Sequence, residues 1–140
     1  MTTLISVEVT INANVETVWE KFTKPEHIVQ WNAASADWHT PSASNDLTLG
    51  GRFNYRMEAR DGSMGFDLGG VYEVVITNDR LRYRLDDNRL VHVLMVPEAD
   101  NTQTRLVEMF ETETQNPPEL QKQGWQAILN NFKQYVEGHA

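Results

Sequence analysis

The sequence predicts an α+β domain: an antiparallel sheet of about seven strands curved around a long C-terminal helix, with two short helices after the first strand. Five short stretches of alternating apolar and polar residues lie between two amphipathic helical patterns. The clearest alternation is at residues 52–60, where Phe53, Tyr55, Met57 and Ala59 all point to one face. A curved sheet that holds one helix tends to enclose a cavity, so we expect a binding protein.

The N-terminal part is expected to form one strand and two short helices. Residues 4–11 alternate and predict the first strand. Asn14 is a suitable N-cap for a helix whose buried face carries Val15, Val18, Trp19 and Phe22. Residues 23–26 have capping-box spacing, with Pro25 in the first turn, and predict a second helix ending near Trp31.

The middle of the chain is expected to supply the rest of the sheet. Residues 32–46 read as a loop, with a strand possible only around residues 38–40. Strands are predicted at residues 52–60, 66–76, 81–85, 90–96 and 104–112, separated by turn signals. Gly69 and Gly70 indicate a bulge or bend, and Pro97 is expected to end its strand.

A long helix is predicted at the C-terminus. Asn116 and Pro117 supply a cap and an N1 proline, and Gly138 closes the helix. Its apolar stripe consists of Leu120, Trp125, Ile128, Leu129, Phe132 and Val136. Gly124 inside the helix costs about 1 kcal/mol relative to alanine, which suits either a close approach of another backbone or room kept for a ligand.

The bulk properties point to a single cytoplasmic domain spanning residues 1–140. The net charge is −8, so phosphate backbones would be repelled and a nucleic-acid partner is not expected. The mean hydropathy is −0.51, and no apolar run approaches the ~20 residues of a membrane span or resembles a secretory signal. There is no cysteine, the histidines lack metal-ligand spacing, and no cofactor motif occurs, so we expect neither metal nor cofactor.

Several segments resemble the START-like (SRPBCC) helix-grip superfamily. They are residues 11–26 with the following Trp31, Leu49-Gly-Gly-Arg-Phe, Gly70-Val-Tyr, Arg80-Leu-Arg-Tyr, Thr104-Arg-Leu and Gly124-Trp125. Within it, the chain is most similar to bacterial relatives of the C-terminal domain of the heat-shock chaperone (Hsp90) ATPase activator. The resemblance implies a seven-stranded sheet around the C-terminal helix with a hydrophobic cavity between them. It says less about function, since these motifs mark packing and turns.

Ten side chains are candidates for binding a small hydrophobic or aromatic molecule. Aromatic residues and methionine make adaptable walls for such a ligand, although each could instead simply fill the core. The candidates are Trp31, Trp38, Phe53, Tyr55, Met57, Phe66, Tyr72, Glu108, Trp125 and Phe132.

Glu108 is the weak candidate for catalysis, because it is in phase with Leu106 and Phe110 and would then face the cavity. A bulge that turned Val107 and Met109 inward would place it outside. His92 is similarly ambiguous: a tight preceding turn puts it on the inner face, whereas the family register puts Val91, Val93 and Met95 there. His39, beside Trp38, could gate an entrance.

Three functions follow from these patterns. The first is non-catalytic binding of a small hydrophobic molecule. The second is a polyketide cyclase or hydratase that uses Glu108, Tyr55 or His92 for proton transfer. The third, implied by the resemblance alone, is a cochaperone-like role with a heat-shock chaperone as partner.

Overall fold

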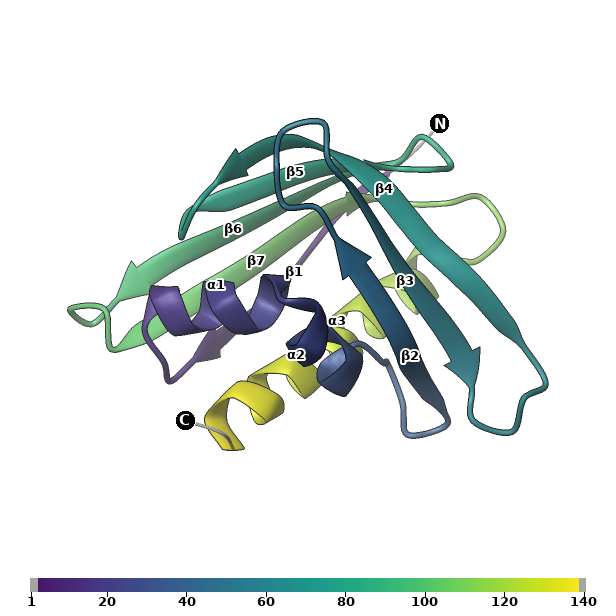
Figure 1. Ribbon diagram of the computed structural model, residues 1–140, viewed down its shortest axis with the longest axis horizontal. Coiled ribbons are helices and arrows are strands. Elements are labelled where there is room, and N and C mark those ends of the chain that lie inside the picture. The colour runs from purple at the N-terminus through teal and green to yellow at the C-terminus, as the bar shows by residue number, and fades with distance from the viewer. Residues whose placement is uncertain (1–2, 139–140) are drawn as a thin grey trace.

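The computed structural model describes residues 3–138, so the outermost two residues at each end of the predicted domain lie outside it. It contains one seven-stranded antiparallel sheet and three helices (Figure 1). In chain order the elements are β1 (Leu4–Ile11), α1 (Val15–Thr23), α2 (Pro25–Trp31), β2 (Trp38–Asn45), β3 (Arg52–Ala59), β4 (Gly65–Ile76), β5 (Arg80–Leu85), β6 (Leu90–Glu98), β7 (Gln103–Glu111) and α3 (Pro118–Gly138). The predicted helix-grip fold is confirmed.

The sheet follows the order β1-β7-β6-β5-β4-β3-β2 and arches over α3, as Figure 1 shows. The alternation of buried and half-buried residues along each strand shows which face of the sheet is the inner one. On β7 the buried residues are Thr104, Leu106, Glu108 and Phe110, and their neighbours along the strand are only half-buried. The same period on β6 buries Val91, Val93 and Met95.

α3 lies toward one edge of the sheet, and among the strands it packs mainly on β1. Gln126 Nε2 donates to the Glu8 carbonyl oxygen at 3.0 Å, which fixes the helix at the β1 edge. Lys133 Nζ donates to the Thr10 carbonyl oxygen in the same way. Because α3 sits on β1, the opposite half of the arch, formed by β3, β4 and β5, faces the helix across a gap.

The two short helices close one side of the arch. Asn14 caps α1 as predicted, since its side-chain oxygen accepts from the Thr17 backbone N–H at 2.8 Å. Phe22 of α1 stacks on Trp31 of α2 with ring centroids 5.2 Å apart, and both rings contact Phe132 of α3. This aromatic cluster joins the three helices.

Two predictions about the region from residue 23 to residue 46 are wrong. Thr23 is the last residue of α1 rather than a cap of α2, and its hydroxyl donates to the Trp19 carbonyl oxygen at 2.7 Å. β2 runs through Asn45 instead of stopping near Thr40. Pro41 is tolerated because β2 is an edge strand and its pairing with β3 shifts between residues 39 and 42.

Two local details also differ from expectation. Pairing is regular at Gly69 and Gly70, and the irregularity lies between Tyr72 and Val74. Gly70 is needed for a different reason: a methyl group there would lie 2.6 Å from the Arg84 carbonyl oxygen. Pro97 lies within β6, near its end, opposite Thr104.

α3 starts one residue later than predicted. Pro118 is its first residue, and the Pro117 carbonyl oxygen accepts from the Leu120 and Gln121 backbone N–H groups. Gly124 does not mark a close approach, because nothing lies within 4 Å of a methyl group built there. Among residues 3–138, no helix is both long and apolar enough to cross a membrane.

Candidate functional site

A pocket of about 300 Å³ lies between the inner face of the sheet and the three helices. It occupies the gap that α3 leaves by packing on β1. β3, β4, β5 and β7 form its roof, and α1, α2 and α3 form its floor and sides. The pocket is therefore where the predicted cavity should be.

Most of the predicted ligand-binding residues line this pocket. Tyr55 and Met57 come from β3, and Phe66 and Tyr72 come from β4. Trp125 of α3 lies flat against Phe110, with ring centroids 4.1 Å apart. The remaining predicted residues in the lining are Trp31 and Glu108.

Three predicted ligand-binding residues do not line the pocket. Phe53 and Phe132 are almost completely buried core residues, at 2% and 0% exposure. Phe53 lies behind the pocket wall, where its ring packs against Tyr55, Tyr72 and Tyr83. Trp38 lines a separate, more polar surface hollow between the start of β2 and α3.

The two candidate histidines, His92 and His39, lie outside the pocket. His92 faces away from the core, since Val91 and Val93 on either side of it are fully buried. Its partner on β5 is Arg82, and Tyr83 pairs with Val91 instead. The family register was therefore the correct alternative, and the catalytic role suggested for His92 has no geometric basis. His39 lines the same surface hollow as Trp38.

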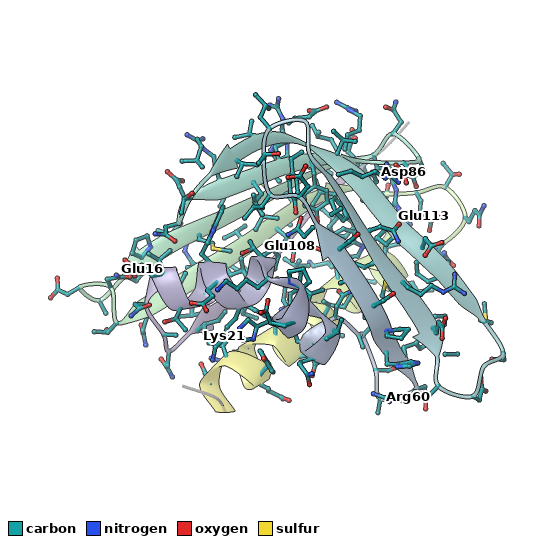
Figure 2. The ribbon with its side chains drawn as sticks, in the orientation of Figure 1. Glu16, Lys21, Arg60, Asp86, Glu108 and Glu113 are labelled. Atoms are coloured by element: carbon teal, nitrogen blue, oxygen red, sulfur yellow. The ribbon has the colours of Figure 1, made fainter. Side chains whose placement is uncertain are left out.

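Glu108 faces the interior, as the in-phase reading predicted. Figure 2 shows it beneath the arch of the sheet, far from the peripheral Glu16 and Arg60. Its side chain is only 5% exposed, and its partners on the neighbouring strands are Val7 and Val93. Burial among apolar side chains raises the pKa of Glu108 to about 8.

Two tyrosines, Tyr55 of β3 and Tyr83 of β5, interact electrostatically with this carboxyl group, and Tyr72 of β4 interacts with Tyr55. Burial raises the pKa of Tyr83 well above its ordinary value, and the nearby Glu108 raises it further. Burial is also the main cause of the raised pKa of Tyr55, with Tyr72 and Glu108 adding to it. Tyr72 has a pKa of about 12 through burial, and its hydroxyl donates to Asn45 Oδ1 at 2.7 Å. All three phenols therefore remain protonated at neutral pH.

One end of the pocket is polar, and hydrogen bonds link the residues that line it. Gln121 Oε1 accepts from the Glu113 backbone N–H at 3.0 Å, and Gln121 Nε2 donates to the Asn116 carbonyl oxygen at 2.7 Å. Hydrogen bonds from the backbone N–H of Gln115 and from Asn116 lower the pKa of Glu113, with a smaller effect from Arg89. This end therefore carries a carboxylate near an arginine.

Several lining residues were absent from the sequence-based set. Tyr83 and Leu81 alternate in phase on β5, and Leu68 is in phase with Phe66, so the period-two pattern could have identified them. The apolar stripes of α1 and α3 similarly contained Phe22 and Ile128. Loop and helix-end residues gave no such signal, because nothing in their pattern sets their direction: Thr23, Asn32, Arg89, Glu113, Asn116 and Gln121.

The pocket is chemically a mostly apolar space with one buried acid. A neutral carboxyl can donate a hydrogen bond or a proton to a bound molecule. Among residues 3–138, no three histidine, aspartate or glutamate side chains gather closely enough to hold a metal ion.

Comparison with solved structures shows the same fold in bacterial proteins of similar size. An AHSA1-like protein from Aeromonas hydrophila is 44% identical, with a TM-score of 0.90 over 98% of this chain and 94% of that chain. A protein from Cytophaga hutchinsonii is 50% identical, with a TM-score of 0.82 over 96% of this chain and 92% of that chain. One from Nitrosomonas europaea shares the fold at 18% identity, with a TM-score of 0.81 over 98% of this chain and 96% of that chain.

None of the curated proteins matches the chain. The family model described as "Activator of Hsp90 ATPase homolog 1-like protein" matches residues 12–137, nearly the whole of the described range. The match covers β2 to β7 and nearly all of the three helices, and so includes every element that lines the pocket. The chain belongs to this family, and with it to the START-like helix-grip superfamily that its sequence resembles.

Proposed function

We propose that this protein binds a small, largely apolar molecule in the pocket between the sheet and α3. The observation that carries the proposal is the offset of α3 toward β1, which leaves about 300 Å³ lined by aromatic and aliphatic side chains. Ligand pockets are typically concave spaces lined mainly by hydrophobic and aromatic side chains with a few polar groups, and the lining of this pocket has that composition. A space of this size in so small a domain supports a binding role.

The dimensions of the pocket limit its ligand. Its volume is at the small end of the ~300–1,000 Å³ typical of ligand pockets, which favours a molecule of about one or two rings. Tyr55 and Trp125 contribute aromatic surface to the lining, and the almost fully buried Trp31 forms part of the wall. Met57 adds an adaptable apolar contact.

Titration with a naphthalene-sized hydrocarbon tests this proposal. We expect 2-ethylnaphthalene to bind with a Kd on the order of 10–1000 µM, because a ligand of this size gains only a few kcal/mol from apolar burial. ¹H–¹⁵N correlation spectra followed during the titration give both the Kd and the residues whose signals move.

A matched pair of tryptophan variants on α3 supplies the control. Ile128→Trp fills the pocket, and we expect it to weaken binding about tenfold or more. Leu120→Trp places the same ring on the same helix at a site that is 54% exposed, and it should leave the Kd unchanged. Equal binding by both variants, or no binding by the wild type, would contradict the proposal.

A second candidate function is supported by the family description. Activators of the Hsp90 ATPase act on a chaperone, so the same role is a candidate for this chain. The test is to add the purified protein to the host's own Hsp90 and measure ATP hydrolysis. An increase in the rate supports a cochaperone role, and an unchanged rate together with no complex in a pull-down argues against it.

A further inference from the structure

The proposed ligand-binding function rests on the apolar walls of the pocket, and one polar group in those walls narrows the class of ligand. We infer that the pocket selects uncharged molecules carrying a hydrogen-bond acceptor, such as a carbonyl oxygen, which accepts a hydrogen bond from the Glu108 carboxyl group. This inference depends on the proposed function and goes beyond it, because it specifies the chemistry of the guest.

The geometry of Glu108 carries the argument. Its side chain lines the pocket, is 5% exposed, and lies between Val7 and Val93 on the adjacent strands. Within residues 3–138 the only buried side-chain nitrogen or oxygen atom without a hydrogen-bond partner is Arg82 Nε, so the Glu108 oxygens are not sealed in the core but open onto the pocket. A carboxyl group that opens onto a mostly apolar pocket is placed to form a hydrogen bond with a molecule bound there.

The surroundings keep this carboxyl group neutral at physiological pH. The titratable groups that face the pocket are Tyr55, Tyr72 and Tyr83 from the sheet, with Arg89 and Glu113 at the polar end. The helices contribute only uncharged side chains to the lining. Burial raises the pKa of Glu108 to about 8, so the group holds its proton at pH 7 and acts as a donor.

Charged ligands are disfavoured by the same arrangement. An anion would find only Arg89, whose Nε already donates to Asp87 Oδ2 at 2.7 Å and whose charge also acts on Glu113. An ammonium ion would have to lose its own hydration and force Glu108 to ionise in an apolar setting. A neutral hydrogen-bond acceptor such as a ketone brings no charge that must lose its hydration, and it does not require Glu108 to ionise.

Four probes with the same ring system test the inference at pH 6.5. They are 2-ethylnaphthalene, 2-acetylnaphthalene, 2-naphthoate and 1-(2-naphthyl)ethylamine, which present no acceptor, a ketone, an anion and a cation in turn. We expect the ketone to bind about three- to tenfold more tightly than the hydrocarbon, which is the effect of one net hydrogen bond. Both ionic probes should bind more weakly than the ketone.

Two variants assign the preference to Glu108. Glu108→Leu removes this donor, so the ketone should lose its preference and bind no more tightly than the hydrocarbon, while the apolar pocket still binds both. Glu108→Gln keeps a donor in its amide and cannot ionise. The ketone preference of this variant should be the same at pH 6.5 and pH 9.5, whereas the wild type should lose its preference at pH 9.5, where Glu108 is a carboxylate that only accepts hydrogen bonds.

The outcomes separate this inference from the function on which it rests. Equal binding of the ketone and the hydrocarbon by the wild type would overturn the inference and leave the apolar binding function standing. Tightest binding of the carboxylate or the amine would also overturn it. No binding of any probe would overturn both. If Glu108→Leu does not fold, the pH profiles of the wild type and Glu108→Gln still decide the question.

Discussion

At the scale of single residues, Glu108 is a carboxyl group buried in an apolar wall. Its burial affects the stability of the fold, and its position allows it to donate a hydrogen bond to a ligand. A carboxylate at its position would have to leave water for a wall made by Val7 and Val93. The protein avoids that cost by keeping the group protonated, and this makes the stability of the fold dependent on pH.

The first prediction concerns that dependence. In the unfolded chain Glu108 ionises near its ordinary pKa of 4.5, whereas the folded protein holds the proton up to about pH 8. Between these values the folded state binds more protons than the unfolded state, so the free energy of unfolding falls as the pH rises. Glu108→Gln removes this contribution, and its stability relative to the wild type should increase by about 3–5 kcal/mol between pH 5 and pH 9.

Urea unfolding of both proteins across this range measures the effect. The carboxylates whose pKa values are lowered, such as Glu73 and Asp86, act at lower pH and are shared by both proteins, so they cancel in the difference. Parallel stability curves for the two proteins would show that Glu108 is ionised or solvated in the folded state.

The inward direction of Glu108 could be predicted only as one of two alternatives. Strict alternation through Leu106 and Phe110 placed it inside, and a bulge would have placed it outside. The choice depends on pairing with β1 and β6, which is not encoded in β7 alone. Arg89 could not be predicted to line the pocket, since its direction is set by the turn and by its bond to Asp87.

At the scale of the elements, strands with a strong alternation of apolar and polar residues were predicted accurately from the sequence. A strand with a mostly polar composition was not. β1 and β3 match their predicted ranges closely because every second side chain is apolar. β2 was largely missed because its sequence is polar and contains Pro41. An edge strand needs only one hydrogen-bonded neighbour and little apolar surface. Its sequence therefore needs neither alternating apolar residues nor the absence of proline.

Two glycines give a prediction at this scale. Gly124 lies inside α3 with open space where a methyl group would go, so Gly124→Ala should raise the free energy of unfolding by about 1 kcal/mol. An alanine substitution at Gly70 should have the opposite effect on stability. Its methyl group would meet the Arg84 carbonyl oxygen and the Phe53 ring, and Gly70→Ala should lower stability by about 1–3 kcal/mol.

Chemical denaturation of the two alanine variants beside the wild type checks both signs. Loss of stability in Gly124→Ala would mean that α3 lies closer to the sheet than it does in this structure. Such a result would also leave less room for a ligand, because Gly124 lies one helical turn from the pocket residues Gln121 and Ile128.

At the scale of the whole molecule, the pocket results from how the sheet and α3 share the interior. The helix is bound to β1 through Gln126 and Lys133, while β3, β4 and β5 continue the arch beyond its reach. The sequence predicted the sheet, the helix and a cavity between them. It could not predict that the helix would lie to one side, because that offset depends on contacts between the two ends of the chain.

Intermolecular nuclear Overhauser effects in a complex with 2-acetylnaphthalene test the central claim most directly. We predict contacts from the ring protons of the probe to methyl groups of Met57, Leu68 and Leu81, which line the pocket on three adjacent strands. Contacts restricted to the outer face of the sheet, at Val74 and Leu94, or no contacts at saturating probe, would contradict the claim that this fold holds its ligand inside.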